Sequence, residues 1–355
     1  MTLGHNFDFE SYCIVGKIVK DSGNVYAETT RYNYGPIFFG IQGLLYTIAS
    51  FTKNVRLVYR ILMVLMLTLV DLGITCIIAK KYSWKKSLIF FLNPVSIIIT
   101  GYHNQFDNIA ILLMLIAGMF FYNEEKDWNY RDFFFVLFMS LSLITKHIFF
   151  ILPLYILLKK DLPISKKLLY SVVPPFLFLL SFVPFAVGNK MALEGIIHNV
   201  FLYRSFNNAP LLIDIYEMLK LPSKFYIVVF IIFMTIFAWI CRRRRFDEII
   251  LLYTMVLVTF SSSIANQYLA IPMVALSVLD VCIFRYIYMI VTGALLVYSG
   301  DGLNYMNHYQ IKGFFFSSKM YSPSVFILFI ILVYEILRND ILSSNQKVEE
   351  IGDNK

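Results

Sequence analysis

Long apolar runs constrain this chain more than any other feature. The clearest is "LVYRILMVLMLTLVDLGITCIIA" at 57–79. Because lipid cannot hydrogen-bond an open backbone, runs of this kind must be helical. The whole chain is 59% hydrophobic and only 15% charged, with a mean hydropathy of +0.68, whereas a soluble domain is about 45–50% apolar and about 25% charged. The sequence therefore predicts an all-α, polytopic transmembrane bundle.

Further apolar runs follow along the chain, separated by polar stretches. They occupy 87–101, 106–122, 133–158, 168–188, 224–241, 249–280, 286–300 and 323–338. The run at 249–280 is too long for one ordinary span and is interrupted by "SSSIANQY". A shorter run at 36–51 need not cross, and we expect it to lie along the outer surface or to dip in and back.

Three basic loops decide how the run at 133–158 is arranged. They are "KKYSWKK" (80–86), "KKDLPISKK" (159–167) and "RRRR" (242–245), and all are typical of the cytoplasmic side. A single crossing at 133–158 would force one of the first two loops outward. Two short helices meeting at Lys146-His147 place all three inside. Each half is then about 18 Å long, shorter than the roughly 30 Å hydrocarbon core, so protein or a water-filled cavity must cover the junction.

About 11 crossings result from this arrangement, with the N-terminus outside and the C-terminus inside. The odd parity is what a missing first helix would produce, unless the chain inserts without one. We expect residues 1–338 to form one membrane domain with an extracytoplasmic first loop at 1–56, and 339–355 to form a cytoplasmic polar tail.

Composition and motifs exclude several function classes. The net charge of +8 is explained by basic cytoplasmic loops, so no nucleic-acid partner is expected. The four cysteines are scattered, without metal-ligand spacing or a disulfide framework. No Gly-rich phosphate loop, Ser-His-Asp order or zinc spacing is present, and we expect no cofactor and no metal site.

In this topology the outward-facing segments are the N-terminal segment, "GYHNQFDN", "TKH", "FLYRSFNNAP" and "SSIANQY", whereas the inward loops are mostly Lys/Arg runs. The outward-facing segments carry Asp8, Glu10, Arg31, His103, Gln105, Asp107, Lys146, His147, Arg204, Asn266 and Gln267. Ionisable groups near membrane depth are expensive and usually line a cavity or a substrate path. Cations for a phosphate and a carboxylate for proton transfer would suit an anionic lipid headgroup that takes part in a reaction.

Simpler interpretations of the N-terminal residues stay open. Asp8 and Glu10 lie in a polar segment and could be solvated surface. Arg31, among tyrosines, could be an interfacial anchor with its stem on apolar surface.

The interior polar residues also have simpler interpretations. Lys146 and His147 could form a water-exposed apex, and Asp107 could be the N-cap of the helix that follows it. Asp71, in the middle of 57–79, is expected to satisfy a neighbouring helix rather than do chemistry.

Four segments resemble parts of the GT-C integral-membrane glycosyltransferases, in that family's order. They are "NFDFESYCIVGKIVKDSGNVYAETTRYNYGPIF", "LNPVSIIITGYHNQFDNIAILLMLIAG", "SLITKHIFFILPLYILL" and "FSSSIANQYLAIPMVAL", and they span most of residues 7–276. The first is similar to the family's first extracytoplasmic loop. The nearest likeness is to prokaryotic relatives of the polyprenyl-phosphate-mannose-dependent mannosyltransferases. One departure is that the helix which precedes this loop in the family is absent here.

The resemblance implies a GT-C fold and inverting transfer of mannose or a similar hexose. The donor would be a polyprenyl-phosphate sugar and the acceptor a glycan or lipid-linked molecule, at an extracytoplasmic site in the cell membrane. Asp8 matches the family's catalytic carboxylate best, with Glu10 in reserve. The cations available for the donor phosphate are Arg31, Lys146, His147 and Arg204. The candidates for sugar or acceptor contacts are His103, Gln105, Asp107, Tyr34, Gln267 and Tyr268.

Two other functions remain open from the sequence. A transporter or flippase of lipid-linked saccharide would also gather polar residues inside a bundle, but it needs them toward both faces and often shows internal repeats. A polysaccharide polymerase would share the outward site, with its chemistry concentrated in a large late loop. The sequence does not specify the sugar, the acceptor or the linkage.

Overall fold

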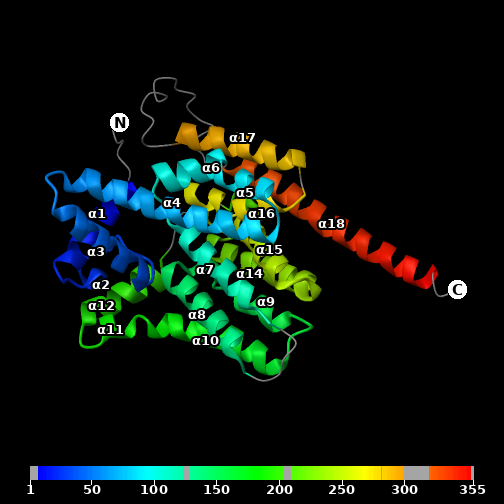
Figure 1. The fold of residues 1–355 in the computed structure, drawn as a ribbon, viewed down its shortest axis with the longest axis horizontal. Coiled ribbons are helices and arrows are strands. Elements are labelled where there is room, and N and C mark those ends of the chain that lie inside the picture. The colour runs from blue at the N-terminus through cyan, green and yellow to red at the C-terminus, as the bar shows by residue number, and fades with distance from the viewer. Residues whose placement is uncertain (1–6, 123–127, 204–208, 281, 300–319, 353–355) are drawn as a thin grey trace.

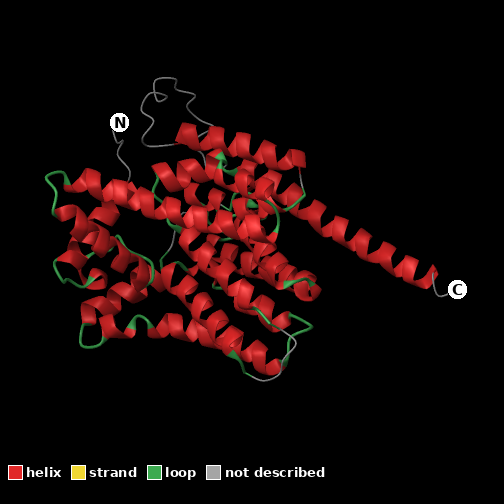
Figure 2. Cartoon of the chain, viewed as in Figure 1, coloured by secondary structure: helices red, strands yellow, loops and turns green. Residues whose placement is uncertain are grey.

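The chain folds into a bundle of helices in the computed structural model (Figures 1 and 2). The structure describes residues 7–122, 128–203, 209–280, 282–299 and 320–352, and these contain no strand. The predicted all-α class is therefore confirmed for the described part of the chain.

The N-terminal segment forms helices α1 (Phe7–Lys20), α2 (Val25–Glu28) and α3 (Pro36–Ser50), with α1 packed along α3. Helix α1 buries Phe9, Tyr12 and Val15, which recur every three residues and so share one helical face. The described part of the expected loop at 1–56 is thus mostly helix, packed into the bundle.

Three helices form the part of the bundle that positions the site: α4 (Val55–Lys81), α7 (Asp107–Phe120) and α8 (Tyr130–Thr145). Helix α7 packs closely on both α8 and α4. Helix α8 begins with a capping box, in which Asn129 and Asp132 bond each other's backbone N–H groups.

The described residues contain three helices long and apolar enough to cross a membrane: Val55–Lys81, Ile164–Ala186 and Ser223–Arg243. A fourth results if Tyr130–Thr145 and His147–Leu158 count as one span. That pair is bent by 110°, and the break falls at Lys146, as the basic loops predicted. The total of about 11 crossings stays a prediction.

Two further apolar runs are also broken. The run at 87–101 is divided into α5 (Trp84–Phe91), α6 (Pro94–Ser96) and the π-helix η1 (Ile97–Tyr102). The run at 249–280 holds most of α15 (Phe246–Thr259), then the 3₁₀ turn η6 (Asn266–Ala270) and α16 (Met273–Val278). The second break includes "SSSIANQY", as predicted.

The remaining elements complete the bundle. They are η2 (His147–Phe149), α9 (Leu152–Leu158), α10 (Ile164–Leu180), α11 (Val183–Ala186), α12 (Lys190–Gly195), η3 (Ile196–Phe201), α13 (Ile213–Met218), η4 (Ser223–Phe225), α14 (Tyr226–Ile240), η5 (Cys241–Arg243), α17 (Cys282–Ser299) and α18 (Ser322–Gly352). Helix α18 projects far beyond the bundle (Figure 1). The described part of the expected tail at 339–355 continues this helix.

The three basic loops meet at one end of the bundle, here called the basic end. Lys81 Nζ lies 3.0 Å from Oδ2 of Asp247, which comes two residues after "RRRR". Lys159 Nζ donates to the carbonyl oxygen of Arg244 at 2.9 Å. These contacts place the three loops together, as a common side requires, and the side of the membrane they occupy stays a prediction.

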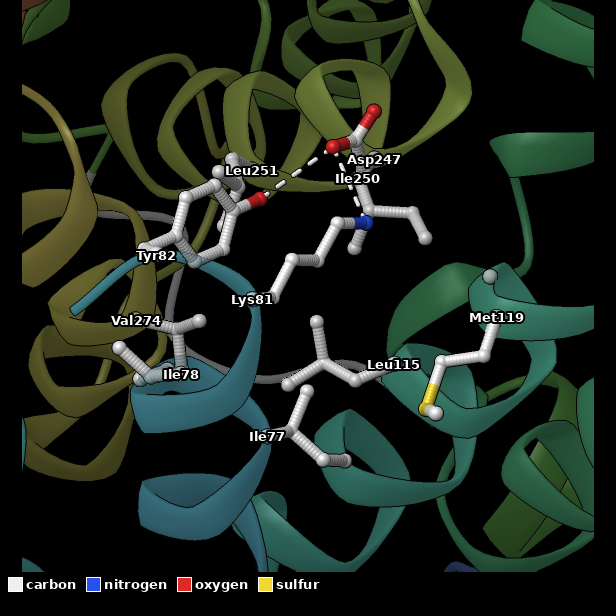
Figure 3. Close-up of a pocket in the computed structure, with 11 residues that line it drawn as sticks. Ile77, Ile78, Lys81, Tyr82, Leu115, Met119, Asp247, Ile250, Leu251 and Val274 are labelled. Atoms are coloured by element: carbon white, nitrogen blue, oxygen red, sulfur yellow. Dashed lines mark hydrogen bonds and ion pairs between the residues drawn. The ribbon is translucent and has the colours of Figure 1, made fainter. Parts of the chain in front are cut away.

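An apolar pocket lies at the basic end, between α4, α7 and α15. In Figure 3, Tyr82 and Lys81 both point at Asp247 on its rim. Its other lining residues are Ile77, Ile78, Leu115, Gly118, Met119, Ile250, Leu251 and Val274. None of the residues predicted to form the site lines this pocket, so it is not the predicted site.

Candidate functional site

Asp8 lies in a hydrogen-bonded cluster at the start of α1. Its Oδ2 accepts a hydrogen bond from Gln105 Nε2 at 2.5 Å. The amide oxygen of Gln105 accepts from the Tyr12 hydroxyl at 3.4 Å. Asp8 and Tyr12 are four residues apart on a helix, so both face the same way. The buried Gln105 amide is thus fixed by two side chains of α1, and the Asp8 carboxylate is oriented in turn.

The turn before α7 explains why Gln105 and Asp107 face different helices. The turn follows the π-helix η1, and its residue Asn104 has φ 58°, in the left-handed region that Asn tolerates better than most residues. The Asn104 amide donates to the carbonyl oxygen of Gly101 at 3.2 Å, which supports the turn. The chain then directs Gln105 toward α1 and Asp107 toward the end of α8.

Asp107 forms a buried ion pair with Lys146. Lys146 Nζ donates to Asp107 Oδ2 at 2.7 Å, and the side chains are 8% and 2% exposed. The ammonium also lies 4.6 Å from the ring centroid of Phe106 and 5.1 Å from that of Tyr34. The other carboxylate oxygen, Asp107 Oδ1, is buried with no hydrogen-bond partner among the described residues.

The surroundings of Asp8 make its carboxyl a stronger proton acceptor than an exposed one. Burial raises the pKa of Asp8, and the nearby Asp107 charge raises it further. Lys146, the Gln105 hydrogen bond and His103 lower the pKa, yet it stays above its ordinary value. A carboxylate with a perturbed pKa in a polar cluster is a candidate for proton transfer.

Two tyrosines predicted to contact the sugar or acceptor, Tyr34 and Tyr268, lie close enough to these carboxylates for the negative charge to raise their pKa. Burial raises the pKa of Tyr34 well above its ordinary value, and Asp8 and Asp107 add to the effect. Burial and the Asp107 charge raise the pKa of Tyr268 to about 12. Both phenols therefore stay neutral and can donate hydrogen bonds. Gln267 lies in the same turn, η6, as Tyr268.

The sequence "RYNYGP" brings α3 against the end of α8. The Tyr32 hydroxyl donates to the carbonyl oxygen of Gly35 at 2.6 Å and closes the turn. A Cβ added to Gly35 would lie 1.8 Å from the carbonyl oxygen of Ile144. Only glycine permits this approach, two residues before Lys146, so Gly35 helps to place Tyr34 beside the ion pair.

Glu10 does not join the cluster. It forms an ion pair with Arg56 of α4. Asp8 and Glu10 are two residues apart on helix α1, which turns them to different sides. Of the two candidate bases, the structure brings only Asp8 into contact with the other predicted site residues.

The predicted cations are scattered, apart from Lys146. The guanidinium of Arg31 lies 3.9 Å from the ring centroid of Phe7. His147 is exposed, and its ring centroid lies 6.3 Å from that of Phe178. Arg204 lies outside the described residues.

Two expectations about individual aspartates can be settled. Asp71 accepts a hydrogen bond from Asn108 of α7 at 2.6 Å, so its predicted role of satisfying a neighbouring helix is confirmed. The interpretation of Asp107 as an N-cap is wrong, because Phe106 occupies the cap position and Asp107 is the first helical residue. Its side chain pairs with Lys146 instead.

Sequence reasoning missed Tyr12 and also Arg60, a buried cation of α4 whose Nη2 donates to the carbonyl oxygen of Tyr102, next to His103. The spacing of four residues from Asp8 on an aromatic-rich helix could have identified Tyr12. Arg60 was not recognised because it falls inside the apolar run at 57–79, where a single cation is easily taken as part of a span.

The described residues contain no group of three or more His, Cys, Asp or Glu side chains that could hold a metal ion. No protein-family model, curated protein or solved structure matches the chain. The resemblance to GT-C enzymes therefore depends on the four sequence segments alone, and the site must be judged by its own geometry.

Proposed function

We propose that this chain is an integral-membrane, GT-C-like glycosyltransferase. It would move mannose or a similar hexose from a polyprenyl-phosphate donor to a glycan or lipid-linked acceptor at the extracytoplasmic face. The observation that carries the proposal is the Asp8 carboxylate, which is oriented by Gln105 at 2.5 Å and has a pKa raised by burial. These are the properties of a positioned general base.

In the proposed reaction, Asp8 takes the proton of an acceptor hydroxyl. The hydroxyl oxygen forms a bond to the anomeric carbon as the bond from that carbon to the phosphate oxygen breaks, with inversion. The polyprenyl phosphate leaves with the electron pair and needs no proton at neutral pH. Asp8 then returns its proton to water, so the base is regenerated after each transfer.

The neighbouring groups have separate tasks in this proposal. Asp107 Oδ1 has no partner among the described residues and can accept a hydrogen bond from a sugar or acceptor hydroxyl. The neutral phenols of Tyr34 and Tyr268 can donate to sugar oxygens. Lys146 holds the Asp107 carboxylate in place through the ion pair, and it limits how far the pKa of Asp8 rises.

Transfer of label from a panel of polyprenyl-phosphate sugars would test the proposal, in membranes that contain a known amount of inserted protein. Asp8→Asn should lower turnover by about 10²–10⁴-fold, because an amide cannot take the hydroxyl proton. Glu194→Gln is the matched control, since the Glu194 carboxylate is 58% exposed, whereas Glu10→Gln should cost less than Asp8→Asn. Full activity in Asp8→Asn would contradict the assignment of the base.

A transporter or flippase of lipid-linked saccharide is the second candidate. It is favoured by the 110° break in the bent helix pair at Lys146, with a buried ion pair beside it, because broken helices with buried charge also form transport sites. Reconstituted liposomes would distinguish the two. If a fluorescent lipid-linked saccharide crosses the bilayer and no sugar is transferred, the transporter is supported and the glycosyltransferase is contradicted.

A further inference from the structure

Arg60 is a buried cation that the proposed chemistry does not use. It lies in the second turn of α4 and is 5% exposed. Its Nη2 donates to the carbonyl oxygen of Tyr102 at 3.1 Å, and its guanidinium carbon lies 5.4 Å from the ring centroid of Phe9. No carboxylate in the described part of the chain pairs with it. A guanidinium has five N–H donors and stays charged. Besides the Tyr102 carbonyl oxygen, the described residues offer Arg60 only the rings of Phe9 and Tyr102, so most of its donors remain available to a ligand.

The other buried cations show how unusual this is. Three of them pair with a carboxylate: Lys146 with Asp107, Lys159 with Asp161 and Lys166 with Asp132. Arg285 donates to two backbone carbonyl oxygens, those of Ser277 and Leu279. Among the residues described, Arg60 has one carbonyl oxygen as acceptor and no carboxylate, so it has fewer acceptors than Arg285.

A second arginine faces the same way one turn earlier. Arg56 precedes Arg60 by four residues on α4, and its guanidinium carbon lies 5.9 Å from the ring centroid of Phe9. Like charges at this spacing repel each other, and the charge of Arg56 acts on Arg60. Glu10 neutralises only one of the two guanidinium groups. The pair therefore carries one positive charge in excess, which an anion beside both arginines would offset.

The arginine pair lies next to the candidate site and next to an apolar surface. The Arg60 contacts Phe9 and Tyr102 adjoin Asp8 and His103 in the sequence. Helix α4 also exposes a series of large apolar side chains: Leu57, Ile61, Leu65, Leu69 and Leu72. The series begins directly after Arg56 and extends over about 22 Å of helix. An apolar chain lying along it would bring its head to the two arginines.

We propose that Arg56 and Arg60 bind the phosphate group of a phosphate monoester with a long apolar chain. Arg60 would bind the phosphate in a bidentate manner, because the planar guanidinium can donate parallel hydrogen bonds to two phosphate oxygens. Naming a polyprenyl phosphate as the natural ligand rests on the proposed function. The donor phosphate would then bind away from Lys146, where a phosphate would have to compete with Asp107 for the ammonium group.

Direct binding measurements would test this with the purified full-length chain in detergent, using farnesyl phosphate as the probe. Wild-type protein should bind farnesyl phosphate more tightly than farnesol, inorganic phosphate or dioleoyl phosphatidic acid. Arg60→Gln should weaken farnesyl phosphate binding by about 10- to 150-fold, the range for a lost charge-assisted contact. Arg60→Lys should recover part of the affinity, and Arg243→Gln, at the exposed basic end, should change nothing.

Several outcomes would overturn the proposal. One is unchanged farnesyl phosphate binding in both Arg60→Gln and Arg56→Gln. Another is equal loss of farnesol and farnesyl phosphate binding, which would indicate structural damage rather than a lost phosphate contact. Preference for phosphatidic acid or inorganic phosphate would assign the site to bulk lipid or to a free anion. A loss seen only in Lys146→Met would return the phosphate to Lys146.

The same measurements separate this inference from the proposed function. If farnesyl phosphate binding depends on Arg60 but the protein transfers no sugar, the phosphate site is supported and the glycosyltransferase proposal is contradicted. If the protein transfers sugar but its farnesyl phosphate binding is unchanged by substitution of either arginine, the glycosyltransferase proposal is supported and the phosphate site at Arg56 and Arg60 is contradicted.

Discussion

The Lys146–Asp107 pair allows a sharp test of how this interior is stabilised. Lys146→Met keeps the apolar stem but leaves the 2%-exposed Asp107 side chain without its cation. Breaking a buried ion pair typically costs about 3–5 kcal/mol. The loss has a ceiling, because an unpaired carboxylate can take up a proton. For an ordinary aspartic acid pKa of about 3.9, protonation at pH 7 costs about 4 kcal/mol.

The expected destabilisation is therefore about 3–4 kcal/mol at pH 7, and it should shrink as the pH falls toward 5. The measurement is equilibrium unfolding in mixed micelles of a mild detergent and dodecyl sulfate, followed by circular dichroism. Removing both charges in Lys146→Met/Asp107→Leu should recover most of the loss, because no charge is then left buried.

An exposed pair provides the matched control. Lys190 and Glu194 lie 3.9 Å apart one helical turn from each other, with side chains 89% and 58% exposed. Lys190→Met should cost less than about 0.5 kcal/mol. The reasoning is refuted if Lys146→Met costs no more than Lys190→Met, or if the double variant is less stable than Lys146→Met alone.

The remaining predictions concern the site. The Gln105 hydrogen bond lowers the pKa of Asp8, so Gln105→Met should move the acid limb of the pH–rate profile to higher pH; a shift to lower pH would exclude Asp8 as the base. Because the folded-state pKa of Asp8 is raised, its contribution to stability is present below the ordinary range and is lost as the pH rises. Asp8→Asn should therefore be at least as stable as wild type near pH 7, which unfolding in mixed micelles would check. Gly35→Ala should lower stability and activity through the clash with Ile144, whereas Gly40→Ala, which meets open space, should be neutral or stabilising by up to about 1 kcal/mol in the same unfolding assay.

Charge patterning and the length of the apolar runs predicted two breaks in the helices. The break at Lys146 followed from the basic loops on either side of it, and the break at "SSSIANQY" followed from the length of the run at 249–280 and its polar interruption. The basic loops and the lengths of the apolar runs can both be read locally in the sequence. Basic loops stay on the cytoplasmic side, and helices too short to span the membrane need protein or a water-filled cavity over their ends. Polar residues at these breaks were accordingly predicted as site candidates.

The pairing within the site could not be predicted from the sequence. Gln105 and Asp107 are two residues apart, yet one contacts α1 and the other contacts Lys146 at the end of α8. The divergence depends on the left-handed backbone at Asn104 and on how three helices pack, and neither leaves a clear sequence signal. The helical nature of the N-terminal segment was more accessible, since Phe9, Tyr12 and Val15 recur at helical spacing.

Two buried aspartates near opposite ends of helix α8 show which end is suited to chemistry. Asp132, at the start of α8, is fully buried, and its oxygens receive hydrogen bonds from Tyr170 and the Asn129 backbone and an ion pair from Lys166 at 3.1 Å. Both of its oxygens are occupied by groups of the protein itself, as in a structural clamp. Asp107, beside the end of α8, has one oxygen paired with Lys146 and the other without a partner in the described part of the chain. A buried acceptor left open costs free energy unless a ligand satisfies it, so the end that holds Asp107, Lys146 and Asp8 is the one where we expect a substrate hydroxyl to bind.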